Sequence, residues 1–219
     1  MIDLITLKPR ILQVLEDPSG KRFDDAALAE AIRQAMNFVN ERLPNIAVCT
    51  FTVTASGRDQ AITGLDNCMY LVSVQVNPDD AYRHEVEPGN SFTYRFQDGN
   101  PVLRFLERNT PQTGDVIRIT YAAPHTLSGL DGATATTLPS ACVSALVNGA
   151  AGQACLLRAS LLCEAYGSRP VETTRLLELS RTLMASFENN LSQYKTLQEF
   201  GFPPGFRLDA EDRQTGAFR

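Results

Sequence analysis

Tryptophan is absent from this chain of 219 residues, and histidine occurs only at His84 and His125. The two histidines lie far apart, and neither belongs to an HExxH or other metal-ligand spacing. The sequence also lacks a GxSxG nucleophile elbow, a GxxxxGK[ST] phosphate loop and a GxGxxG dinucleotide motif. We therefore predict a protein with no catalytic residues, no metal site and no cofactor.

Clusters of positive charge are also lacking. The chain carries 20 lysines and arginines against 25 aspartates and glutamates, which gives a net charge of −5, and it has no run of five or six basic residues. Because DNA and RNA backbones are bound by clustered Lys and Arg, this balance argues against a free-standing nucleic-acid-binding protein. No basic and apolar leader opens the chain, which predicts synthesis in the cytoplasm.

Cysteine pairing motifs are missing too. The chain has five cysteines, an odd number, and none of them shows CxxC spacing. This pattern predicts buried, reduced thiols rather than a disulfide framework or a zinc site. The five are Cys49, Cys68, Cys142, Cys155 and Cys163.

Only one apolar stretch approaches membrane-spanning length. Residues 141–157 include no charge, but they are mostly alanine and glycine, so we predict no membrane span. Glycine inside a helix costs roughly 1 kcal/mol relative to alanine, which calls for a packing reason. Ala145, Gly149 and Gly152 are therefore predicted to allow a close helix–helix contact, either within one subunit or between subunits.

Apolar residues at helical spacing predict two helices near the start of the chain. The first covers 4–15, and Pro9 places its regular part from about Lys8, because proline is tolerated only in a first turn. The second covers 24–42, and one of the two aspartates that open it caps its first turn.

The middle of the chain changes to an alternating period, which is typical of half-buried strands. About five strands joined by short polar turns predict an antiparallel sheet or sandwich. Residues 124–138, rich in Gly, Thr and Ser, are expected to form a loop. The predicted strands are 46–54, 70–77, 92–96, 102–107 and 116–122.

A helical hairpin is predicted after this loop. Pro139 opens a helix that runs to about residue 165, and a second helix with a continuous apolar stripe follows over 171–200. The complete chain is therefore predicted to have an α+β fold. We expect a helical body from 1–44 and 138–200, an inserted antiparallel β-domain at 45–137, and an extended C-terminal arm at 201–219.

Two stretches resemble bacteriophage head-to-tail adaptor (neck) proteins. The first is the opening run, in which an apolar helix is followed by LEDPSGKRFDDAAL and then by AIRQAMNFVNERLP. The first of these segments contains a short Asp-containing loop that ends in an aromatic residue and an acidic helix cap. The family often has tryptophan where this chain has Phe23. The second stretch is VLRFLERNTPQTGDVIRITYAAPHTL followed by TLPSACVSALVNGAAGQACLLRA, similar to the family's strand, loop and Pro-opened helix.

The resemblance implies a structural virion protein that forms a homo-oligomeric ring, usually of twelve subunits, beneath the portal. Such a ring joins the portal protein to a tail-side neck or tail protein. Genomic DNA would pass through it without sequence-specific binding, and no membrane would be involved. The protein would be made in the host bacterial cytoplasm and located in the virion.

The resemblance also implies a C-terminal arm that reaches into the portal, and the segment after residue 200 is the candidate. Its prolines exclude a continued helix. Aromatic residues on an extended arm can dock on a partner and become ordered on binding, whereas a frayed terminus is the other interpretation. The candidate portal-binding residues are Phe200, Phe202, Pro203, Pro204, Phe206, Arg207 and Phe218.

Two other function classes fit these residues. A tail-completion, stopper or baseplate component would also be a multimer but would lack a portal-docking arm. A soluble ligand-binding domain or enzyme with a β-cavity would instead be a monomer or dimer with a convergent polar pocket.

Overall fold

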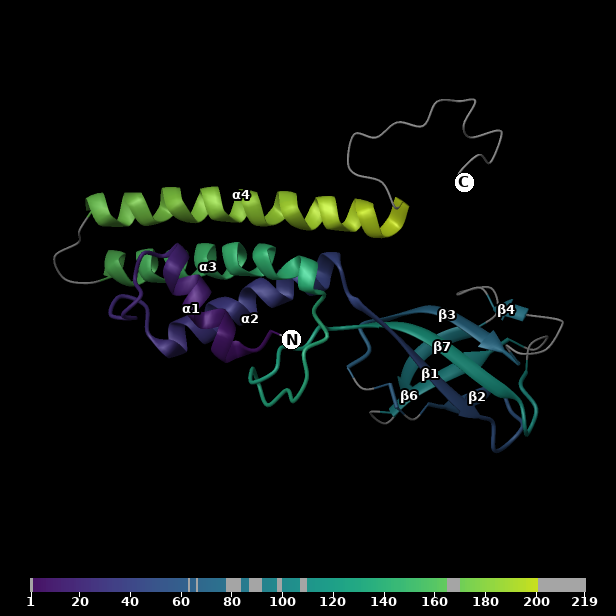
Figure 1. Ribbon diagram of the computed structural model, residues 1–219. Coiled ribbons are helices and arrows are strands. Elements are labelled where there is room, and N and C mark those ends of the chain that lie inside the picture. Colours follow the sequence, from purple (N-terminus) through teal and green to yellow (C-terminus); the bar gives the residue numbers. More distant parts are fainter. Residues whose placement is uncertain are drawn as a thin grey trace, which may run out of the picture. The chain divides into compact units, whose positions relative to one another are not determined.

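The computed structural model describes residues 2–62, 64–65, 67–77, 84–86, 92–97, 100–106, 110–164 and 170–200. The chain divides into two compact units. Met1–Leu43 and Thr126–Arg219 form one unit, and Pro44–His125 forms the other. The first unit is helical and the second consists of antiparallel strands (Figure 1). The predicted α+β fold class is confirmed.

Helix α1 (Leu4–Val14) begins earlier than the sequence suggested. Asp3 accepts a hydrogen bond from the backbone N–H of Thr6 at 2.8 Å, and Thr6 Oγ1 accepts one from the Asp3 N–H at 3.2 Å, which completes a capping box. Pro9 is exposed, so the carbonyl deprived of its amide partner can bind water. The predicted start near Lys8 was wrong, because this cap stabilises the turn that precedes the proline.

Helix α2 (Asp25–Arg42) is capped by Asp24, whose Oδ1 accepts a hydrogen bond from the N–H of Ala27 at 2.7 Å. Its apolar side chains recur at helical spacing and form one buried face. The buried apolar residues are Leu28, Ala31, Ile32, Ala35, Met36 and Val39.

Helix α3 (Val143–Glu164) is the centre of the helical unit. A short 3₁₀ turn, η2 (Ser140–Cys142), follows Pro139 and leads into it. Helix α3 contacts α1, α2 and the long helix α4 (Pro170–Phe200), which runs alongside α3 in Figure 1. Helix α3 is long and apolar enough to cross a membrane, but 67% of the relevant window is buried inside the protein. It is therefore explained as a core helix.

Two glycines let α3 and α4 approach closely. A Cβ atom on Gly149 would lie 3.0 Å from three ring atoms of Phe187, and one on Gly152 would lie 3.0 Å from Cγ of Met184. The hydroxyl of Ser180 donates a hydrogen bond to the backbone oxygen of Gly152 at 2.8 Å. The glycines thus face a helix of the same chain.

The segment 126–137 belongs to the helical unit, whereas the sequence analysis placed it in the β-domain. The hydroxyl of Thr136 donates a hydrogen bond to the backbone oxygen of Ile2 at 2.7 Å. Arg33 on α2 donates to both carboxylate oxygens of Asp131, at 3.0 and 2.7 Å. These polar contacts tie the loop to the helices, and its composition gave no sign of them.

The second unit contains two antiparallel sheets in the described part of the chain. Two of the strands, each three residues long, were not predicted, because so short a run shows no alternation. One sheet has the order β1 (Asn45–Thr52), β7 (Val116–Ala123), β3 (Tyr70–Val76), β4 (His84–Val86), and the other has the order β2 (Asp59–Ala61), β6 (Asn100–Phe105), β5 (Phe92–Gln97).

A single core joins these two sheets. Ile117 and Ile119 on β7 meet Leu103 and Phe105 on β6, and all four side chains are fully buried. The rings of Phe105 and Phe92 lie 6.3 Å apart between centroids. Of the two predicted arrangements, an antiparallel sheet or a sandwich, the structure has two sheets that share one apolar core.

Replacing Gly149 by alanine tests the close approach of α3 and α4. At an exposed position inside a helix, this change would raise the free energy of unfolding by roughly 1 kcal/mol. Because the new methyl group meets the buried ring of Phe187, we expect instead a net loss of about 1–3 kcal/mol in the free energy of unfolding. Urea denaturation followed by far-UV circular dichroism measures this loss.

The exposed Ser160 on the same helix provides a matched control. Ser160→Ala should change stability by less than about 0.5 kcal/mol. Gly149→Ala should also cost less in a Phe187→Leu background. An equal cost in both backgrounds would contradict the proposed steric contact.

Candidate functional site

One buried carboxylate organises the loop between α1 and α2, the segment that carries the adaptor-like sequence. Asp17 is only 5% exposed, and its Oδ2 accepts hydrogen bonds from the backbone N–H groups of Arg22 at 2.7 Å and Phe23 at 3.1 Å. Desolvation by itself would raise the pKa of Asp17, but the backbone hydrogen bonds outweigh it and hold the pKa below its usual value. The loop is thus closed around an anion.

Arg22 and Phe23 fasten this loop to the helices. Nη2 of Arg22 donates to the backbone oxygens of Leu15 at 2.9 Å and Glu16 at 2.8 Å, at the C-terminal end of α1. The ring of Phe23 is buried, with the guanidinium carbon of Arg22 6.0 Å and that of Arg158 5.6 Å from its centroid. Phe23 therefore anchors the loop against α3.

An open groove lies beside this junction, along one flank of α4. At its rim, Nη2 of Arg158 is 3.7 Å from Glu172, and Nη2 of Arg175 is 3.9 Å from Glu16. Burial raises the pKa of the Cys155 thiol to about 11, so this sulfur stays protonated and is not an activated nucleophile. The apolar lining consists of Val14, Leu15, Phe23, Cys155, Leu176 and Leu179.

Metal-binding groups are not assembled in the part of the chain that the structure describes: no three His, Cys, Asp or Glu side chains come together there. All five cysteines fall within that part, and none of them forms a disulfide there. Cys142 and Cys155 are buried, as predicted, and Cys49 and Cys68 are half-buried. Cys163 is exposed, contrary to the prediction, and lies in the largely exposed last turns of α3.

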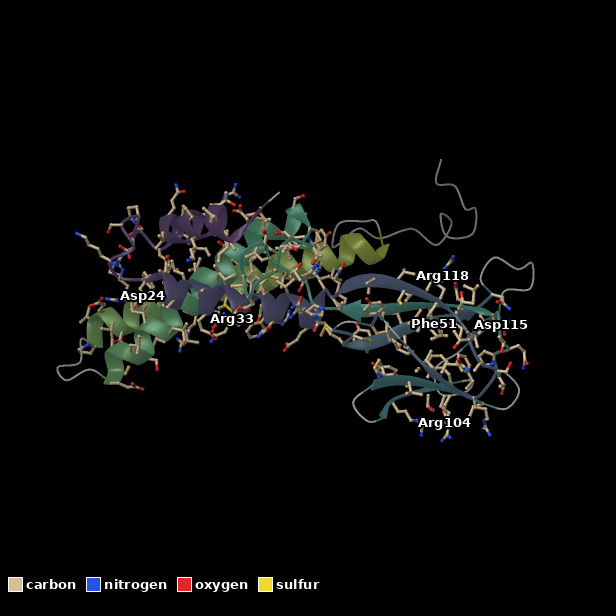
Figure 2. The ribbon with its side chains drawn as sticks, turned by 90° about the horizontal axis from the view of Figure 1, so that it is seen from below. Asp24, Arg33, Phe51, Arg104, Asp115 and Arg118 are labelled. Carbon is tan, nitrogen blue, oxygen red and sulfur yellow. The ribbon has the colours of Figure 1, made fainter. Side chains whose placement is uncertain are left out.

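Some basic side chains in each unit lie beside carboxylates. In the strand unit, Asp59 lies 3.2 Å from Arg95 and 3.0 Å from Arg104, which is labelled in Figure 2. In the helical unit, Arg33 pairs with Asp131 at 2.7 Å. These pairings reduce the positive charge that the surface presents.

The residues predicted to pack helices and those predicted to bind the portal lie in different parts of the chain. Ala145, Gly149 and Gly152 are buried in α3, and the two glycines face α4. The arm candidates Phe202, Pro203, Pro204, Phe206, Arg207 and Phe218 lie outside the described residues, as does the side chain of Phe200, the last residue of α4.

A family model described as "SU10 adaptor protein" matches residues 2–198. The chain belongs to the SU10 adaptor protein family. The match covers both the helical and the strand unit, and it confirms the resemblance to bacteriophage head-to-tail adaptor proteins. This is a family of structural phage proteins rather than of enzymes.

No curated protein matches the chain. Among solved structures, one similar chain comes from a structure described as "Neck of empty GTA particle computed with C6 symmetry". It is 18% identical, the match covers 72% of this chain and 78% of that chain, and the TM-score is 0.28. Since whole chains superpose poorly at this score, the assignment to the SU10 adaptor family rests on the family match.

The sequence identified the adaptor-family loop as a marker without showing how it is held. Asp17 precedes a Pro-Ser-Gly turn, and an aspartate at such a turn is a signal for side-chain bonding to nearby backbone. The sequence gave no comparable indication for Arg158, because this residue lies 136 positions from Arg22, whose backbone oxygen accepts its hydrogen bond.

Substituting Asp17 by asparagine tests the role of the anion. We expect a lower melting temperature at neutral pH, because a neutral amide oxygen accepts the two N–H bonds more weakly than a carboxylate does. The pKa of Asp17 is lowered in the folded state, so its stabilisation is complete above the unfolded value of about 3.9 and is lost as pH falls through the folded value. The difference between parent and variant should therefore shrink in strong acid.

Differential scanning calorimetry between neutral pH and strong acid measures this dependence. Asp25→Asn is the control, since the Asp25 side chain is 85% exposed and pairs only with Lys8 in the described ion pairs. That control should change the melting temperature little at neutral pH. An Asp17→Asn deficit that stays constant down to strong acid would count against the charged acceptor.

Proposed function

We propose that this chain is a structural virion protein that joins the portal of a bacteriophage to its tail. It acts as one subunit of a ring beneath the portal, twelve copies being usual for the family. Its partners are the portal protein, a tail-side neck or tail protein, and other copies of itself. The match to the SU10 adaptor family over residues 2–198 is the observation that carries this proposal.

The charge distribution supports a ring through which genomic DNA slides. The chain has a net charge of −5, and many of its basic side chains stand beside carboxylates. Phosphate contacts by clustered Lys and Arg would retain DNA. A protein with net negative charge, some of whose cations are paired with carboxylates, would let DNA pass without sequence-specific binding.

The chemistry of the described residues supports a role in assembly rather than catalysis. The groove beside α4 presents paired ions and a thiol whose pKa burial raises to about 11. One buried apolar core instead packs the four helices together. A helical unit packed in this way suits a subunit that transmits force between portal and tail.

The C-terminal arm, residues 201–219, is the proposed portal contact. All described helices and strands end by residue 200, and we expect the truncated chain to keep the melting temperature of the parent. We expect it to lose binding to purified portal protein, measured by surface plasmon resonance, and to fail to attach tails in particles that lack the parent protein.

A paired substitution sharpens the test. Phe202→Ala combined with Phe206→Ala should weaken portal binding by roughly 30-fold or more, because truncating one interface hot spot costs about 2 kcal/mol. Gln214→Ala, a polar change in the same arm, is the control and should bind normally. Normal portal binding by the chain without residues 201–219 would exclude the arm and favour a stopper or tail-completion component.

A further inference from the structure

We propose that strand β1 pairs with strand β4 of a neighbouring copy, so that one antiparallel sheet continues from subunit to subunit. This inference rests on the proposed ring and names the contact that would close it. Among the described strands, β1 and β4 are the two ends of the four-stranded sheet. Neither has a second neighbour among the described strands, and a sheet edge of this kind can accept a strand from another chain.

The sequence of β1 lacks the usual protection of an edge strand. Its eight residues, NIAVCTFT, contain no charge, no proline and no glycine. Natural edge strands are normally short or carry lysine, proline or a bulge, because an unprotected edge recruits other strands. A long, uncharged edge is therefore expected to have a partner in the assembled state.

The backbone groups that would make this contact can be identified. Just after β1, the N–H of Val53 donates to the backbone oxygen of Asp115 at 2.8 Å, so this N–H points toward β7. The next oxygen along, that of Val116, accepts from the N–H of Asn77 at 2.7 Å and so points toward β3. Since hydrogen-bonding direction alternates along a strand, the N–H groups of Val48 and Thr50 point away from β7. These amides lie on the open edge.

Side chains on both faces of β1 are incompletely covered. On the outer face, Ile46 is 50% and Val48 is 60% exposed. On the inner face, Phe51 is half-buried, although Ile117, its partner on β7, is fully buried. Phe51 is labelled in Figure 2. A strand added beside β1 would cover apolar surface on both faces.

Strand direction argues for a second copy of this chain as the occupant. All neighbours in the sheet are antiparallel, so its four strands leave β1 and β4 pointing in opposite directions. Strand β4 of the next copy can thus pair with β1 in the same antiparallel manner as every other neighbour. The contact joins two different edges, so it is heterologous and can close into a ring. Pairing of β1 with β1 would stop at a dimer.

Proline at position 48 tests the pairing directly. Val48→Pro removes an outward N–H without removing a bond to β7, a change that edge strands tolerate. Its melting temperature should match that of the parent, while the amount of multimer formed on purified portal protein should fall at least roughly tenfold. Val48→Thr keeps both the amide and the strand propensity, and it should assemble like the parent. Native mass spectrometry measures the multimer.

Hydrogen exchange on the unmodified chain provides an independent readout. When the parent assembles on the portal, the amides of Val48 and Thr50 should become at least tenfold more protected, whereas that of Phe51, which faces β7, should change little. The strand pairing is wrong if the parent forms a multimer and Val48→Pro assembles equally well. It is also wrong if the parent forms a multimer and these amides gain no protection. In both cases the proposed ring is unaffected. A multimer that stops at two copies also overturns the pairing. If the parent forms no multimer on the portal, the ring proposal fails and the pairing fails with it.

Discussion

The close contact between α3 and α4 is the constraint on which the helical unit depends. Because Gly149 and Gly152 carry no side chains, Phe187 and Met184 can lie directly on the α3 backbone. Helix α3 then contacts α1 and α2 as well as α4. A helix enclosed in this way must be apolar around its whole circumference, which explains why it resembles a membrane span in composition while being a core helix.

The adaptor-family loop has a structural function in the same unit. Asp17 accepts hydrogen bonds from two backbone amides, Arg22 donates to the last carbonyls of α1, and two guanidinium groups lie near the Phe23 ring. Arg158 carries this arrangement onto α3. The loop that marks the family in the sequence thus links helices α1 and α2 to helix α3. An aromatic residue suits this position because its ring fills the core and also attracts nearby cations.

The strand unit follows a different physical rule. Its core between the two sheets is closed, with Ile117, Leu103 and Phe105 fully buried, but one sheet ends in the uncharged strand β1. In a helix every central backbone group is bonded internally, whereas a sheet always leaves bonding groups at its edges. In the proposed assembly the helical unit therefore supplies the rigid body, and the strand unit supplies an edge through which copies join.

Local patterns in the sequence determined the helices, the five longer strands, the α+β class and the family, because period, caps and turn residues act over a few positions. Three features were decided only by tertiary structure. Segment 126–137 joins the helical unit through Thr136 and Asp131, Arg158 meets a loop 136 residues away, and β1 lies at an edge. Each depends on contacts between distant residues, and neither composition nor periodicity records which distant residues will meet.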